Sequence, residues 1–150
     1  MHVELADESA MELVELRASD GLAVRALPNG CLYAIQRNEI LINQILASPV
    51  AGGVHRVFLR VHDAGETHFT EIVGPAATSE FTSARDRLVY SGTWRGLRYR
   101  CTCWLHPGVG GAWFHHVEVE NTSDTSARCD AILVQDVGLA TRGQGCITTS

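Results

Sequence analysis

The sequence contains no lysine, and all twelve of its basic residues are arginine. A lysine Schiff base, a lysine phosphate clamp and a lysine general base are therefore excluded. Basic charge is also scarce, because the first 20 residues hold six acids against Arg17, while the other 130 hold eleven acids and eleven arginines. Without a basic stripe to neutralise phosphates, nucleic acid is a poor partner for this chain.

Long hydrophobic runs are missing as well. They extend over a few residues, as in 131–134, whereas a helix that spans a bilayer needs about 20 apolar residues. We therefore expect no membrane segment here, although a longer parent protein could be membrane-associated through other segments. The five cysteines are irregularly spaced and the N-terminus is acidic where a secretory signal is basic, so we expect a cytoplasmic chain.

What the sequence does contain is the composition of an ordinary globular domain. Of the 150 residues, 45% are hydrophobic and 19% are charged. A chain of this length buries roughly two thirds of the surface that it exposes when unfolded. We therefore treat residues 1–150 as a single folded domain.

Short runs rich in β-branched and aromatic residues recur between turns such as Asp20-Gly21 and Pro28-Asn29-Gly30. Such turns favour hairpins because Gly and Asn accept a positive φ. The expected strands lie near 12–18, 22–27, 31–36, 39–43, 54–62, 67–73, 86–91, 97–105, 112–120 and 128–135. About ten strands without a clear helix predict an antiparallel all-β fold.

Alternation along the strands predicts one dry face for each sheet. Within 97–105, Leu97, Tyr99, Cys101, Cys103 and Leu105 share one face, and polar residues with Trp104 share the other. Two half-buried sheets that cover each other's apolar faces form a β-sandwich. A capping box at Ser9 and Glu12 is the competing signal for a short helix, but the strand interpretation leads directly into the Asp20-Gly21 turn.

Neighbouring histidines at 115 and 116 are a candidate metal pair. Adjacent residues on a strand point to opposite faces, so they cannot chelate one ion together. The other histidines show no metal-ligand spacing, and we expect no metal site. Cys101 and Cys103 lack the two-residue spacer of redox and zinc pairs, and we expect buried, inert thiols.

Aromatic residues are the remaining candidates for a binding site. The set Trp94, Trp104 and Trp113, with Tyr99, His115 and His116, could form a carbohydrate-binding platform, because aromatic faces pack on the C–H surfaces of sugars. Within it, Trp94, Trp113 and His116 are the residues that we expect to bind the sugar. The competing interpretation is that these large rings fill the core. Glu118 and Glu120 share a face with His116, which is the arrangement of a catalytic acid pair, but charged outward residues on an antiparallel strand look the same.

Taken in order, several blocks resemble the N-terminal region of the inverting glycoside phosphorylases of the cellobiose phosphorylase and β-1,2-oligoglucan phosphorylase family. The phosphorylase-like domain of cyclic β-1,2-glucan synthases belongs to the same family. The resemblance extends over about 12–140 and rests on the order of the blocks, and TRGQGCITTS (141–150) does not continue it. The blocks are 21–30, ILINQ (40–44), SPVAGG (48–53), VFLR (57–60), GP (74–75), WRGLRY (94–99), WFHHVEVENTS (113–123) and QDVGLA (135–140).

The resemblance implies a part of a large antiparallel β-sandwich, followed in such enzymes by linker helices and a catalytic α/α-toroid. The family reaction is phosphorolysis of a β-glucoside, with inorganic phosphate as co-substrate and no organic cofactor. Phosphate takes the place that water has in an inverting glycosidase. The family's general acid and phosphate-binding residues lie in the toroid, so the resemblance assigns no catalytic residue to this chain.

We therefore expect a non-catalytic fragment of a larger sandwich that packs on the toroid of its parent chain and supports a homo-oligomer. A stand-alone carbohydrate-binding module that uses the exposed aromatics to hold a β-glucan is the alternative. A third hypothesis is an aldose-epimerase-like enzyme with His115 or His116 and Glu118, which requires an acid and a base that converge on one pocket.

Overall fold

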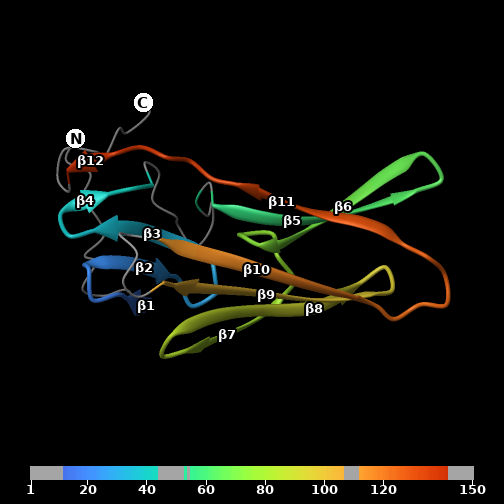
Figure 1. Ribbon diagram of the computed structural model, residues 1–150, viewed down its shortest axis with the longest axis horizontal. Coiled ribbons are helices and arrows are strands. Elements are labelled where there is room, and N and C mark those ends of the chain that lie inside the picture. Colours follow the sequence, from blue (N-terminus) through green and yellow to red (C-terminus); the bar gives the residue numbers. More distant parts are fainter. Residues whose placement is uncertain (1–11, 44–52, 54, 107–111, 142–150) are drawn as a thin grey trace, which may run out of the picture.

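The computed structural model describes residues 12–43, 53, 55–106 and 112–141 (Figure 1). Every regular element in this part of the chain is a β-strand, as expected. The strands are β1 (Val14–Arg17), β2 (Leu22–Ala26), β3 (Leu32–Arg37), β4 (Ile40–Leu41), β5 (Arg56–Asp63), β6 (Glu66–Val73), β7 (Glu80–Ala84), β8 (Arg87–Trp94), β9 (Leu97–Leu105), β10 (Trp113–Asn121), β11 (Arg128–Val134) and β12 (Ala140–Thr141).

The contested N-terminal segment is a strand over Val14–Arg17, which pairs with β2. Ser9 of the competing capping box lies outside the described residues, as do 142–150. Two strands were not predicted, β7 and the two-residue β12. Both lie at sheet edges, where half-buried alternation is weak because little of the strand faces the core.

All strand pairs are antiparallel and form three sheets. Their strand orders are β1-β2-β3-β4-β12, β10-β9-β8-β7 and β11-β5-β6. In Figure 1 the four-stranded sheet runs along the molecule, with the five-stranded sheet toward the left and the three-stranded sheet toward the upper right. One hydrophobic cluster contains residues from all three sheets, so the fold is a β-sandwich whose second layer is divided between two sheets.

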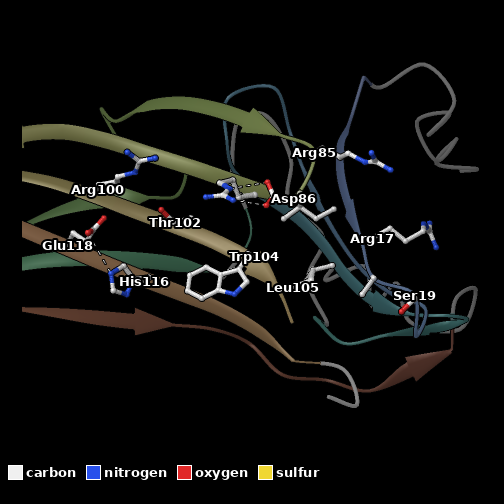
Figure 2. A pocket seen from close by; sticks show the side chains of 13 residues that line it. Arg17, Ser19, Arg85, Asp86, Arg100, Thr102, Trp104, Leu105, His116 and Glu118 are labelled. Atoms are coloured by element: carbon white, nitrogen blue, oxygen red, sulfur yellow. Dashed lines mark hydrogen bonds and ion pairs between the residues drawn. The ribbon is translucent and has the colours of Figure 1, made fainter. Parts of the chain in front are cut away.

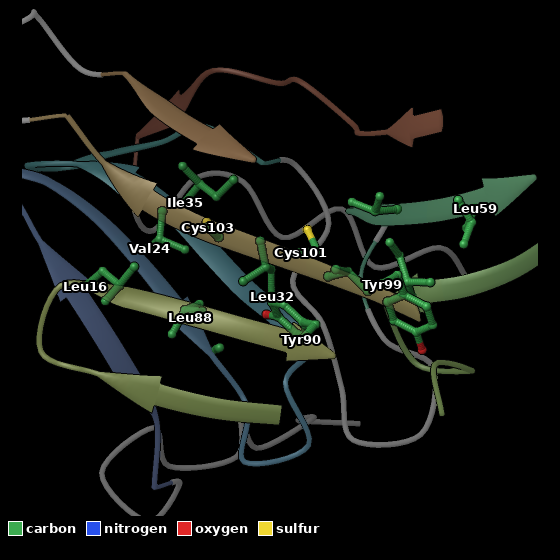
Figure 3. Packing of buried hydrophobic residues seen from close by; sticks show 14 of the residues in the cluster. Leu16, Val24, Leu32, Ile35, Leu59, Leu88, Tyr90, Tyr99, Cys101 and Cys103 are labelled. Carbon is green, nitrogen blue, oxygen red and sulfur yellow. The ribbon is translucent and has the colours of Figure 1, made fainter. Parts of the chain in front are cut away.

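Strand β9 lies at the centre of this packing. Its residues alternate between buried and less buried positions, which confirms the predicted dry face. Figure 3 shows Cys103 beside Val24 of the five-stranded sheet, and Tyr99 at the other end near Leu59 of the three-stranded sheet. The inward face of β9 therefore joins both halves of the second layer into one core.

Polar atoms of the buried tyrosines are paired. The Tyr90 hydroxyl donates a hydrogen bond of 2.7 Å to the carbonyl oxygen of Gly30. The Tyr99 hydroxyl lies 2.9 Å from Ser79 Oγ, which donates to the carbonyl oxygen of Ile72 at 2.7 Å. These bonds offset the cost of burying the hydroxyl groups.

The described residues include no helix of the length and hydropathy that crossing a membrane requires. Cys101 and Cys103 are buried and not in disulfides. Burial raises the pKa of each thiol to about 12. The expected burial of this pair is confirmed, and the expected lack of reactivity stays a prediction.

Candidate functional site: a groove beside Trp104

The outward face of the four-stranded sheet carries aromatic, cationic and acidic side chains. The strand register sets its side chains in cross-strand rows. Trp104 lies between Arg87 on β8 and Phe114 on β10, and Arg100 lies opposite Glu118. Side chains in directly opposed positions are close enough to interact, so the rows bring aromatic, cationic and acidic groups together.

A groove of about 910 Å³ lies over this face (Figure 2). The sheet provides one side of it, and β1 with the turn between β7 and β8 provides the other. The lining residues are Leu16, Arg17, Ala18, Ser19, Arg85, Asp86, Arg87, Arg100, Thr102, Trp104, Leu105, His116 and Glu118. Such a mixture of one large ring with hydrogen-bonding groups is typical of small-ligand sites.

Two of the four arginines in the groove are tied to carboxylates. Arg87 makes two hydrogen bonds to Asp86, at 2.9 and 2.7 Å, and Arg17 lies 2.7 Å from Glu15. Among the described residues, Arg85 and Arg100 form no ion pair. Their guanidinium groups are therefore available to a ligand.

Trp104, which lines the groove, belongs to a group of aromatic rings that extends from β9 to β10. The rings of Trp104 and Phe114 are stacked, with centroids 5.6 Å apart and an interplanar angle of 21°. His116 lies 6.3 Å from Trp104, and His106 meets the edge of Phe114 at 5.8 Å. Phe114 is 41% exposed, so the stack lies at the surface and not in the core.

His116 and Glu118 both point outward from β10, and His116 Nε2 lies 3.9 Å from Glu118 Oε1. Both side chains are exposed, so this pair is a weak interaction in water. His115 points to the inward face, as the alternation predicted. Of the residues named for an epimerase-like enzyme, His116 and Glu118 therefore share the groove as an exposed pair, whereas His115 lies on the other face of the sheet.

The inward His115 has a partner that the sequence did not reveal. His55 Nε2 lies 3.0 Å from His115 Nε2, and the ring centroids are 4.8 Å apart. Burial lowers the pKa of His55 to about 3, with the charge of His115 as a second cause, and burial lowers the pKa of His115 to about 4. Both rings are neutral at pH 7, with one N–H shared between them.

The three residues proposed as a carbohydrate platform do not form one site. Trp94 and Trp113 both pack against the core cluster, and they lie opposite Leu97 and Leu105, at the two ends of β9. Of the three, only His116 lines the groove. A sugar-binding role for this set stays a prediction, without a shared surface to support it.

Trp104 is among the aromatic residues considered for the platform, although it is not one of the three chosen as sugar-binding residues. The alternation of 97–105 already placed it on the outward face, opposite the buried cysteines. The position of Phe114 behind its ring depends on the register of β9 with β10, which sequence periodicity alone does not fix.

Within the described ranges, no group of three or more His, Cys, Asp or Glu side chains is arranged to hold a metal ion. The groove offers instead a stacking surface, hydrogen-bond donors and two carboxylates. These groups can stack on a ligand and form hydrogen bonds with it.

Comparison with known proteins gives a relative and a family. A 1,2-β-oligoglucan phosphorylase from Listeria innocua is 24% identical over 128 residues, which are 85% of this chain and 11% of that protein. The chain thus spans about a tenth of the length of this relative. The profile of the SOGP N-terminal domain matches residues 25–146, most of the sequence. The chain therefore belongs to the SOGP N-terminal domain family.

Proposed function

We propose that this chain is the non-catalytic N-terminal β-sandwich domain of a β-glucan-active glycoside phosphorylase or a cyclic β-1,2-glucan synthase. It packs on the catalytic α/α-toroid of the same parent chain and supports its dimerisation in the cytoplasm. The observation that carries the proposal is the family match over residues 25–146. The printed activity of the Listeria relative supplies the class of substrate.

The reaction proposed for the parent needs a carboxylic acid to protonate the leaving oxygen while inorganic phosphate attacks the anomeric carbon from the opposite face. In this proposal the toroid supplies the acid and the phosphate site. Two features of the sandwich fit an accessory role. His115 is turned to the core against His55, and the carboxylate of Asp86 is held by Arg87.

Exposed apolar side chains fit a role in packing on another unit. Leu133 and Val134 of β11 are exposed, as are Val137 and Leu139 of the following segment. Apolar groups gathered along an edge strand favour contact with another surface. In the proposed parent, this edge packs on the rest of the polypeptide.

An immunoblot of the source organism tests whether this chain is part of a larger enzyme. Antibodies raised against the 150-residue chain are expected to detect a band many times heavier than 16.3 kDa. Peptides from that band should cover both residues 25–146 and a long helical region. A single band near 16 kDa, without larger species, would overturn the proposal, because no toroid would be attached.

A further inference from the structure

We propose that the groove beside Trp104 binds a stretch of neutral β-linked glucan, with Trp104 as the stacking surface. The location follows from the geometry of the groove, whereas the choice of a β-glucan rests on the proposed function. Neither the family match nor the Listeria relative assigns a ligand to these residues.

The stacking surface is held in place before any ligand arrives. Trp104 is half-buried, and Phe114 stacks on it from the β10 side. The groove is lined by Trp104 and by Arg87, its register partner on the β8 side. Because packing fixes the ring, a sugar that stacks on it loses little side-chain freedom from the protein. Phe114 is therefore a positioning residue.

Next to the ring, the groove offers both donors and acceptors. The guanidinium group of Arg100 and the carboxylate of Glu118 lie opposite each other across β9 and β10. Thr102 and His116 form the row between them and the ring. A sugar hydroxyl both donates and accepts hydrogen bonds, so a mixed row of this kind suits a polyol.

Acids lie beside three of the four groove arginines, so a neutral ligand fits the groove without supplying a counter-charge. Asp86 and Glu15 hold two of the four groove arginines, and Glu118 faces Arg100 across the strands. Arg85 forms no ion pair among the described residues. Glu118 and Asp86 would also repel an anion.

The length of the surface favours a chain over a single sugar. A second hollow, of about 610 Å³, shares Arg100 and Glu118 with the groove and continues to Arg98 and Glu120. The six residue steps along β9 from Trp104 to Arg98 cover about 20 Å. An oligosaccharide can follow this line, whereas a monosaccharide would occupy one end.

Isothermal titration calorimetry with the intact 150-residue chain tests the proposal. The probes are β-1,2-linked glucopentaose, maltopentaose as an α-linked comparator, and inorganic phosphate. We expect saturable binding of the β-linked probe that the Trp104→Ala variant weakens about tenfold or more. The Phe69→Ala variant is the matched control, because it removes an exposed aromatic ring from β6 in another sheet.

A second variant separates loss of binding from loss of fold. Arg100→Met keeps the alkyl stem of an exposed residue and removes the donors, and it should weaken binding while the circular dichroism spectrum is unchanged. No binding of the β-linked probe by the unmodified chain would overturn the proposal. Equal affinity in Trp104→Ala, tighter binding of phosphate, or preference for maltopentaose would also overturn it. None of these results would change the immunoblot, so the groove and the proposed function fail separately.

Discussion

At the scale of single residues, the neutral His55–His115 pair makes stability depend on pH. The pKa values in the folded chain are about 3 and about 4, below the ordinary value near 6.5, so the unfolded chain takes up protons first as pH falls. We expect the free energy of unfolding to decrease by on the order of 3 kcal/mol from pH 7 to pH 5. Urea unfolding at several pH values measures this.

Replacement of the histidines isolates their contribution. Burial also raises the pKa of Glu71, which acts in the opposite direction, so the difference between variants is decisive. His55→Gln should flatten the dependence of stability on pH. His116→Gln, which changes an exposed histidine next to the pair, should leave it as it is. An unchanged slope in His55→Gln would show that the pair is not the cause.

Gly30 provides a second test at the residue scale. Its φ is +85°, and a Cβ at this position would lie 2.9 Å from atoms of Phe81 and Tyr90. We expect Gly30→Ala to destabilise the fold by about 2 kcal/mol or more, through backbone strain and overpacking. Gly65 has a similar φ of +88° but open space at its Cβ position. The Gly65→Ala control introduces the backbone strain without the steric contacts. If both variants lower the free energy of unfolding equally in thermal unfolding, the packing argument is contradicted.

The histidines also show the limit of sequence reasoning about single residues. The alternation of a strand predicts that His115 and His116 face opposite ways, because the side-chain period is two. The partner of His115 is 60 residues away, at His55. No local pattern connects the two positions, since their approach depends on how the sheets pack.

At the scale of elements, the position of β9 in the core makes its two cysteines less accessible to reagents than the cysteine of β11. The thiols of Cys101 and Cys103 are buried on its inward face, with pKa values of about 12, whereas Cys129 on β11 is exposed. The thiolate is the reactive form. We therefore expect iodoacetamide at pH 8 to alkylate Cys129 well before Cys101 or Cys103 in the native chain. Peptide mass mapping measures this, with a urea-unfolded sample as control, and equal native rates would contradict the placement of β9.

The strands predicted well are those with one buried and one wet face. β9 is the example, because alternation marks it clearly, whereas β2 and β3 are buried on both faces and are marked instead by their apolar residues and by the turn at Gly30 between them. β7 was missed since Phe81 is its one large apolar residue, in the sequence EFTSA, and it lies at a sheet edge. The sequence pattern also did not predict the division of the second layer into two sheets, because strand order depends on pairing between residues that are far apart in the sequence.

At the scale of the whole molecule, the exposed edge at β11 predicts self-association of the isolated chain. Val137 and Leu139, which follow the edge strand β11 in the sequence, are 70% and 78% exposed, and Leu133 on that strand is also exposed. Sedimentation velocity should show a dimer or larger species that grows with concentration. Leu139→Glu should shift the population toward monomer, and Thr67→Glu, at an exposed site on β6, should not. A monomer at all concentrations would contradict the prediction.

The most direct test of the account is an assay of glucose 1-phosphate released from β-1,2-glucooligosaccharides in the presence of inorganic phosphate. The 150-residue chain should release none, and the longer polypeptide that contains it should release the product with inversion at the anomeric carbon. Release by the short chain alone would place the catalytic groups within these residues. No release by the longer polypeptide from any β-glucan would contradict the proposed role in a β-glucan-active phosphorylase.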